Sequence, residues 1–202
     1  MIILRQTIIQ NQRMISNHIY ESTLRDLATL KEDQMIVDTC IDNFVNTLQK
    51  QYNREEVTLL SSHVFNLMKT HGFEDSQDFI NSTTLSCPKL IFPCHIFIDS
   101  GIGHWVTLMR ILKNHKISFY YIDSLKNSMT SLNNIKEVLC NTPLFPSNQG
   151  VSWINIMNPP QKELKCGSQV GLHMHLCCEG STIEYLLNKF RQLPKGNISR
   201  NK

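Results

Sequence analysis

Apolar residues recur at the spacing of a helix between Lys31 and Lys50. Steps of four, three and four positions place them on one face of that helix. These residues are Val37, Ile41, Phe44 and Leu48. The next segment, "EVTLLSS", predicts a short strand, and "HVFNLMKTHG" predicts a second helix that begins at Ser61 or Ser62 and ends at Gly72. The first seventy residues are therefore expected to be mainly helical.

The pattern changes to that of strands between Lys89 and Leu125. Three segments rich in β-branched and aromatic residues, "KLIFPCHIFI", "HWVTLMRIL" and "ISFYYIDSL", are separated by "DSGIG" and "KNHK". Apolar residues occupy both faces of the second and third segments, so we expect these two strands in the middle of a sheet with helices on at least one side. A helix over 131–139, a short strand "SWINI" and a helical region over 167–193 with a break near Gly180 complete an α+β domain.

Composition and charge indicate one globular domain without a charged binding surface. The 202 residues are 41% hydrophobic and 18% charged, which is enough for a single core. We expect one domain over 1–202, with a core at about 20–193 and a basic tail at 194–202. The net charge of +3 is spread along the chain, so neither a nucleic acid nor a membrane is an expected partner.

The cysteines indicate a reducing compartment. Their number, seven, is odd, and their scattered positions do not resemble a disulfide framework. The opening residues lack the apolar run expected of a secretion signal, and the sequence has no apolar stretch of about 18 residues, so we expect neither a signal nor a membrane span. We expect an intracellular protein of the cytoplasm or nucleus, or of an infected host cell if the protein is viral.

A predicted hairpin brings a histidine and an aspartate together. If Lys113 and Asn114 form a two-residue turn, His104 lies opposite Asp123, with Cβ atoms about 4.5–5.5 Å apart. A shift of the turn by one residue moves the partner of His104 to Leu125. A carboxylate beside an imidazole holds its tautomer and stabilises the imidazolium, which is the supporting half of a nucleophilic site.

A candidate nucleophile follows a polar loop that begins with proline. Cys166 precedes a helical run, and the positive end of a helix dipole together with an imidazolium can lower a thiol pKa from about 8.5 to roughly 3.5–7.5. Backbone N–H groups at this helix start and the side-chain amide of Gln161 are candidate donors to an oxyanion. The other six cysteines are interpreted as inert core residues: Cys40, Cys87, Cys94, Cys140, Cys177 and Cys178.

The segments "GHWVTLMRI", "YYIDSL", "PPQ" and "KCG", in this order, resemble a known family. They are similar to the Ulp1/SENP family of papain-like cysteine proteases, which cleave ubiquitin-like modifiers such as SUMO and NEDD8, with the adenovirus protease as a more distant relative. The resemblance extends over about residues 20–190. The matching residues are His104 with Trp105, Asp123 with Ser124, Gln161, and Cys166 with Gly167.

The resemblance implies a papain-like fold, a central mixed sheet flanked by helices, and a His104, Asp123 and Cys166 triad. It also implies Gln161 in the oxyanion hole, Trp105 as a wall of the substrate channel, a protein substrate, and no cofactor or metal. The chain departs from the family at Lys165, where aspartate is usual, and Gln161 stands one position closer to the cysteine. The opening helix lacks the family's tryptophan, and Met35 or Ile36 stands near its place.

Three functions follow from these matches and departures. The first is a protease that cuts at the carboxy-terminal Gly-Gly of a SUMO- or NEDD8-type modifier. The second is a protease that processes a viral or mobile-element polyprotein, and the third is a catalytically silent module of the same fold that binds a modifier.

Overall fold

The computed structural model describes most of the chain after the first 37 residues. The described residues are 38–53, 55–97, 103–124, 129–145, 150–157, 166–180, 184 and 188. All of them belong to one compact unit, Met35–Lys202. The predicted limits of the domain core, near 20 and 193, lie outside the described residues, as do Met35, Ile36 and Val37.

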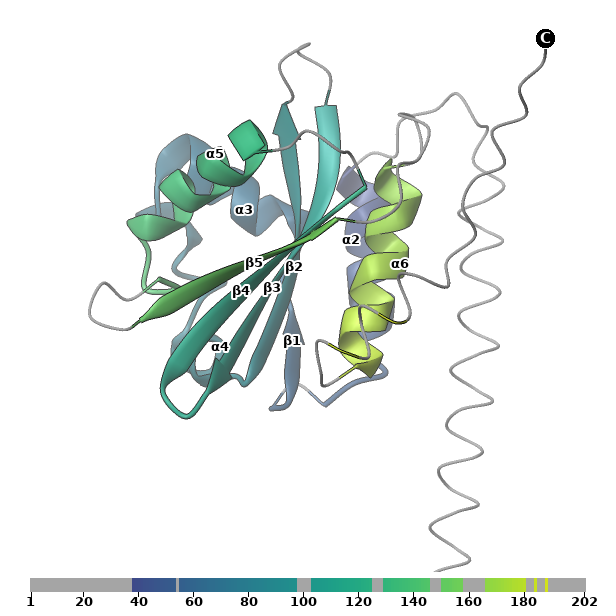
Figure 1. The fold of residues 1–202 in the computed structure, drawn as a ribbon, viewed down its shortest axis with the longest axis horizontal. Helices are drawn as coiled ribbons and strands as arrows, with labels where there is room; N and C mark the ends of the chain where they lie inside the picture. The colour runs from purple at the N-terminus through teal and green to yellow at the C-terminus, as the bar shows by residue number, and fades with distance from the viewer. Residues whose placement is uncertain are drawn as a thin grey trace, which may run out of the picture. The chain divides into compact units, whose positions relative to one another are not determined.

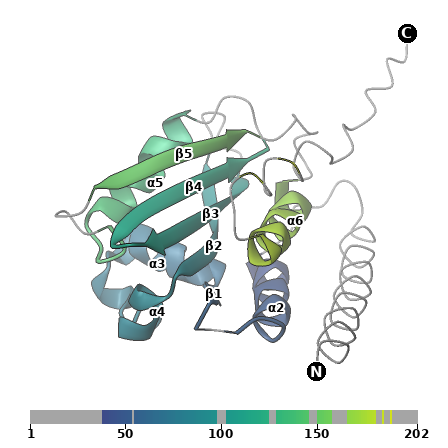
Figure 2. The ribbon, with the colours of Figure 1, turned by 60° about the horizontal axis from the view of Figure 1, so that its bottom comes forward.

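Five strands form one mixed sheet in the order β1-β2-β3-β4-β5 (Figures 1 and 2). The two outer pairs, β1 with β2 and β4 with β5, are parallel, and the two inner pairs are antiparallel. The second and third predicted strands are interior strands, as expected. The strands are β1 (Val57–Leu59), β2 (Lys89–Phe97), β3 (Gly103–Lys113), β4 (Lys116–Asp123) and β5 (Val151–Met157).

Helices cover both faces of this sheet, so the predicted α+β class is confirmed. In both views α3 and α5 lie on one side, and α2 and α6 lie on the other (Figures 1 and 2). The pattern did not predict η1 and α4, which have three and five residues and are too short to carry a helical repeat. The helices are α2 (Asp38–Gln49), α3 (Ser62–His71), η1 (Glu74–Ser76), α4 (Ser82–Ser86), α5 (Met129–Cys140) and α6 (Cys166–Glu179).

Local signals set the ends of α3. The Ser61 hydroxyl accepts a hydrogen bond from the His63 N–H at 3.1 Å, which satisfies one of the donors that the first helical turn leaves unpaired. Gly72 follows the helix with φ of 87°, and its N–H donates to the Met68 carbonyl. Both predicted helix boundaries are thus confirmed, because capping depends only on residues that are close in the chain.

The main core lies between the sheet and the layer of α3 and α5. Leu108 and Tyr121 from the sheet and Phe65 from α3 are among its fully buried side chains. Phe119 is also buried, and its ring stacks on Trp153 of β5 at 4.6 Å between centroids. The interior strands β3 and β4, which carry the polar residues described below, are therefore part of this core.

The β3–β4 turn lies at the later of the two predicted positions. Its central residues are Asn114 and His115, with φ of 51° and 60°, and Lys113 pairs with Lys116. Of the two turn positions that the sequence left open, the structure has the one shifted by one residue, not Lys113 and Asn114. A two-residue turn of this type needs positive φ at both central positions, which asparagine adopts more readily than lysine.

Candidate active site

His104 and Asp123 form a buried pair where β3 begins and β4 ends. The distance from His104 Nε2 to Asp123 Oδ1 is 2.7 Å, and each residue is 1% exposed. Because Thr107 pairs with Ile122, Val106 rather than His104 lies opposite Asp123, which is the alternative register of a turn shifted by one residue. A shift of two residues keeps both side chains on the same face, and the diagonal positions are within reach of an imidazole and a carboxylate.

This pair sets the protonation of the histidine. An ionised carboxylate only accepts hydrogen bonds, so Nε2 of His104 is the donor to Asp123. In the neutral imidazole the basic nitrogen is then Nδ1. His104 is thus prepared to take up a proton at Nδ1 while Asp123 stabilises the resulting imidazolium.

A tyrosine from the same strand supports the pair. The Tyr121 hydroxyl donates to Asp123 Oδ2 at 2.8 Å, and Tyr121 is fully buried. The sequence analysis did not single out this residue. A signal was present, because residues two apart on a strand share a face.

Helix α6 begins at Cys166, as the sequence analysis predicted for its candidate nucleophile. The side chain of Cys166 and the whole of Gln161 lie outside the described residues. The helix is attached to β3, where the Thr107 hydroxyl donates to the Val170 carbonyl at 3.5 Å. A cysteine at the first position of a long helix lies at the positive end of the helix dipole.

The other end of α6 is held by a lysine from β2. The Lys89 ammonium donates to the Cys177 carbonyl at 2.9 Å and also to the Gly180 carbonyl. Burial lowers the pKa of Lys89, but the carbonyls at a helix end favour a cation. The predicted break near Gly180 is confirmed, since α6 ends at Glu179.

His173 brings a second imidazole from α6 close to the pair. Burial lowers its pKa to about 3, with the charge of Asp123 opposing that shift and the charge of His104 adding to it. His173 is therefore neutral at physiological pH. No group of three or more histidine, cysteine or acidic side chains among the described residues is arranged to hold a metal.

Trp105, the predicted wall of the substrate channel, is 2% exposed. Its ring packs on the His95 ring, with 4.8 Å between centroids and 38° between planes. Successive residues of a strand point to opposite faces, so Trp105 and His104 point to opposite sides of β3. Burial is the main cause that lowers the pKa of His95.

The interpretation of the other cysteines as core residues holds for some of them. Burial raises the pKa of Cys94, and it raises the pKa of Cys177 to about 12. For Cys140 the interpretation was wrong, because this residue is exposed at the last position of α5. Cys40 on α2 is partly exposed.

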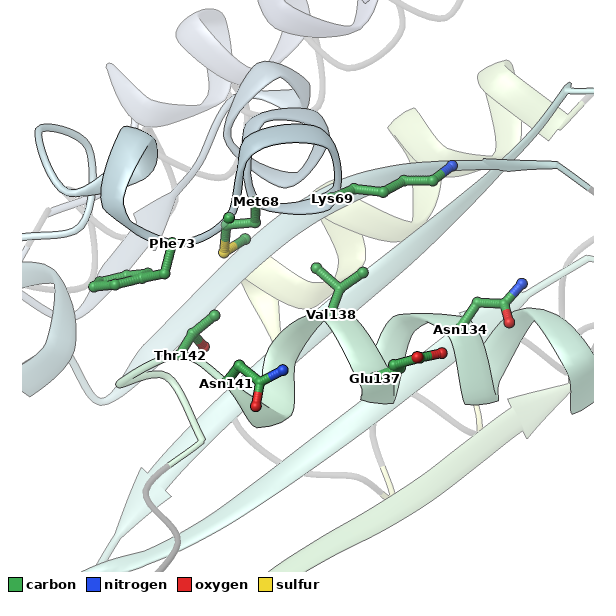
Figure 3. A pocket seen from close by; sticks show the side chains of 9 residues that line it. Met68, Lys69, Phe73, Asn134, Glu137, Val138, Asn141 and Thr142 are labelled. Carbon is green, nitrogen blue, oxygen red and sulfur yellow. The ribbon is translucent and has the colours of Figure 1, made fainter.

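A separate hollow of about 380 Å³ lies between α3 and α5 (Figure 3). In the close-up, Met68 and Val138 approach each other across it, while Glu137 and Asn134 line the side of α5. No residue of the pair or of the start of α6 lines this hollow. It has no nucleophile beside a base, so it does not compete with the His104 and Asp123 pair as a candidate active site.

No helix in the described part of the chain has the length and apolar character needed to span a membrane.

Comparisons with known proteins connect this architecture to one group of proteases. No protein-family model and no curated protein matches the chain. The fold is similar to the Ulp1 protease domain in complex with Smt3, the yeast ortholog of SUMO, with a TM-score of 0.57, 18% identity, and coverage of 83% of this chain and 78% of that chain.

Two further solved structures are similar at comparable levels. The Xanthomonas campestris effector protein XopD, bound to ubiquitin, has a TM-score of 0.55 and 12% identity, with 80% of this chain and 81% of that chain covered. The ASFV protease has a TM-score of 0.53 and 12% identity, with 78% of this chain and 64% of that chain covered. The chain has the fold of the Ulp1-like cysteine proteases.

Proposed function

We propose that this protein is a cysteine peptidase in which Cys166 is the nucleophile, His104 is the general base and Asp123 orients the base. Two observations carry this proposal: the buried 2.7 Å bond between His104 and Asp123, and a helix, α6, whose first residue is a cysteine. The fold shared with Ulp1-like proteases supports it. Acyl transfer by a thiolate needs this set of groups.

In the first step, the Cys166 thiol gives its proton to Nδ1 of His104, and the thiolate attacks the substrate carbonyl carbon. A C–S bond forms and the carbonyl electron pair moves onto oxygen. The tetrahedral intermediate then collapses, the C–N bond breaks, and the imidazolium gives its proton to the leaving amine. A thioester on Cys166 and a free amine are the products of this step.

In the second step, His104 takes a proton from water as the water oxygen attacks the thioester. The C–S bond breaks, the acid product leaves, and the imidazolium returns its proton to the thiolate, which restores the starting thiol and neutral imidazole. Asp123 stabilises the imidazolium in both steps. We assign the oxyanion donors to the Cys166 N–H and the Gln161 side-chain amide.

For the substrate we propose the carboxy-terminal Gly-Gly of a ubiquitin-like modifier. The support is that one similar structure is a protease in complex with the yeast ortholog of SUMO, and another is bound to ubiquitin. Such conjugates occur in the cytoplasm and nucleus, where we place the protein. A polyprotein is the second candidate, since a viral protease has a similar fold.

Selective alkylation tests the nucleophile. Iodoacetamide at pH 6–7 should label Cys166 rapidly, because a helix start and an imidazole favour its thiolate. Cys177 is an internal control on the same helix, since its pKa of about 12 leaves almost no thiolate. Peptide mass spectrometry over time measures both rates. Equal slow labelling of the two would refute Cys166 as the nucleophile.

A panel of probes tests the substrate. SUMO, NEDD8 and ubiquitin, each with a carboxy-terminal electrophile, are compared with a peptide library, and Cys166→Ala is the blank. Capture of the SUMO or NEDD8 probe in preference to ubiquitin supports the modifier substrate. Library cleavage without capture of any probe supports a polyprotein. Modifier binding with neither capture nor cleavage would identify a silent binding module and overturn the proposed activity.

A further inference from the structure

We propose that Tyr121 is a positioning residue of the active site, whose hydroxyl holds the Asp123 carboxylate in the orientation that bonds His104. This inference rests on the proposed function and assigns a further residue to it. The Tyr121 hydroxyl lies 2.8 Å from Asp123 Oδ2, and His104 Nε2 lies 2.7 Å from Asp123 Oδ1. One carboxylate thus links two side chains from neighbouring strands.

The geometry of β4 explains how Tyr121 reaches its partner. Residues two apart on a strand point to the same face, about 6.6 Å apart along the chain, and a phenol is long enough to bring its hydroxyl beside the Asp123 carboxylate. Tyr121 is fully buried within the core that α3 and α5 cover. Packing therefore fixes the position of the Tyr121 ring and of its hydroxyl. The hydroxyl in turn holds the Asp123 carboxylate in place through its hydrogen bond.

Rotation of the carboxylate is what this contact prevents. The terminal torsion of an aspartate is broad and has roughly two-fold symmetry, so a second hydrogen bond to the other oxygen defines the carboxylate plane better than a bond to one oxygen. Because Tyr121 and His104 each bond a different oxygen of Asp123, rotation would weaken both bonds. The carboxylate plane in turn fixes the imidazole plane and the direction of its Nδ1.

The contact also acts on charge. Asp123 is 1% exposed, and burial without partners disfavours an ionised carboxylate. A hydroxyl that donates to the ionised form favours it, and only the ionised form stabilises an imidazolium at His104. Loss of the Tyr121 hydroxyl should therefore leave the His104 ring less firmly oriented and its imidazolium form less stabilised.

Tyr121→Phe separates this role from packing, since it keeps the ring and removes only the hydroxyl. Tyr120→Phe is the matched control, because Tyr120 is the adjacent residue of β4, points to the opposite face and is half-buried. The comparison uses the full chain and the best substrate from the probe panel. Thermal unfolding of both variants checks that the fold is retained.

Tyr121→Phe should lower kcat about 10- to 100-fold, by analogy with the loss seen when a hydrogen-bond partner that orients a metal ligand is removed, and leave KM within about two-fold. The bell-shaped pH profile of kcat for this variant should narrow from both the acid and the alkaline side. When the imidazolium of His104 is less stabilised, the Cys166 thiolate is present beside it over a smaller pH range. The neighbouring imidazoles of His173 on α6 and His95 on β2 are present in the variant and in the original chain. Their effect on the pH profile is therefore the same in both and does not change the comparison. Tyr120→Phe should change neither quantity more than about two-fold.

A double variant tests whether Tyr121 acts through Asp123. In the Asp123→Asn background, adding Tyr121→Phe should change kcat less than two-fold, because the oriented carboxylate is already lost. Independent, multiplying losses would overturn the proposal, as would a Tyr121→Phe variant with the kcat and pH profile of the original chain.

An NMR titration keeps this inference distinct from the proposed activity. The His104 imidazole should titrate at lower pH in Tyr121→Phe than in the original chain, whether or not any substrate is cut. If this shift appears in a protein that cuts no substrate, the positioning role stands and the peptidase proposal fails. An unchanged His104 titration overturns the positioning role itself.

Discussion

The two ends of the β3–β4 hairpin hold buried ionisable side chains in different ways. At the open end, His104 bonds the carboxylate of Asp123. Towards the turn, on the same face of β3, Arg110 is 1% exposed and donates to the carbonyls of Leu85 and Cys87 at 2.7 and 2.9 Å.

The difference lies in the partners rather than in burial. A guanidinium stays charged and backbone carbonyls exchange no protons, so Arg110 can only fasten the end of α4 to the sheet. An imidazole and a carboxylate both titrate, so His104 and Asp123 can move a proton. Equally buried polar residues in one strand thus separate into a structural anchor and a candidate catalytic group.

The largest expected effect is at the open end. His104→Ala should lower turnover by a factor of about 10³ or more, because the general base is lost. Turnover is measured per folded molecule, with circular dichroism as the check on folding. A loss of less than about ten-fold would mean that the pair is structural, like Arg110.

Arg110→Met should produce the opposite result. It should lower the free energy of unfolding by about 2–4 kcal/mol, because one buried and one part-buried carbonyl lose their donor, while turnover per folded molecule stays within about two-fold. Urea unfolding measures the first quantity and the probe assay the second. A catalytic loss that exceeds the loss of folded protein would show that the two ends of the hairpin are coupled.

A smaller effect is expected at His173, through pH. Its folded pKa of about 3 lies below the ordinary value of 6.5, so between these values the unfolded chain binds a proton that the folded chain does not. The free energy of unfolding should therefore fall by about 1.4 kcal/mol per pH unit as the pH drops below 6.5, with no such contribution above it.

His173→Gln should remove this contribution to the pH dependence of the free energy of unfolding. Urea unfolding of the variant and of the original chain at pH 7 and pH 5.5 measures it. His63→Gln is the control, since His63 is an exposed histidine on α3. An identical slope in the His173 variant would show that burial of this imidazole does not govern the acid sensitivity.

The smallest effect is expected at the turn. His115 is exposed and has φ of 60°, a conformation that glycine adopts without a steric penalty. His115→Gly should raise the free energy of unfolding by about 0.5–1 kcal/mol and leave turnover unchanged. Lys113→Gly, inside β3, should destabilise instead, and a loss of stability in both variants would contradict the assigned turn.

The order and type of the main elements could be predicted because they depend on residues close in the chain. Ile41, Phe44 and Leu48 share a helix face that is buried as predicted, and Ser61 and Gly72 end α3 through local hydrogen bonds. Cys166 at the start of α6 followed from the same kind of pattern.

The sequence also brought His104 and Asp123 together, although it left their register open. The first of the two registers left open placed them directly opposite each other, whereas the ladder follows the shifted one, in which they lie diagonally. The contact survived because the side-chain period of a strand is two, and a shift of two residues leaves both side chains on the same face.

Only the tertiary structure decided which contacts join distant parts of the chain. Lys89 bonds the Cys177 carbonyl across 88 residues, and Thr107 bonds the Val170 carbonyl across 63. Alternation along β4 permits the Tyr121 to Asp123 bond, but the packing of the core fixes the ring that makes it. Patterns in the sequence indicate hydrogen bonds and helix or strand faces only among residues a few positions apart. The burial of a side chain depends on how the sheet and the helices pack, and the low pKa of His173 follows from that burial.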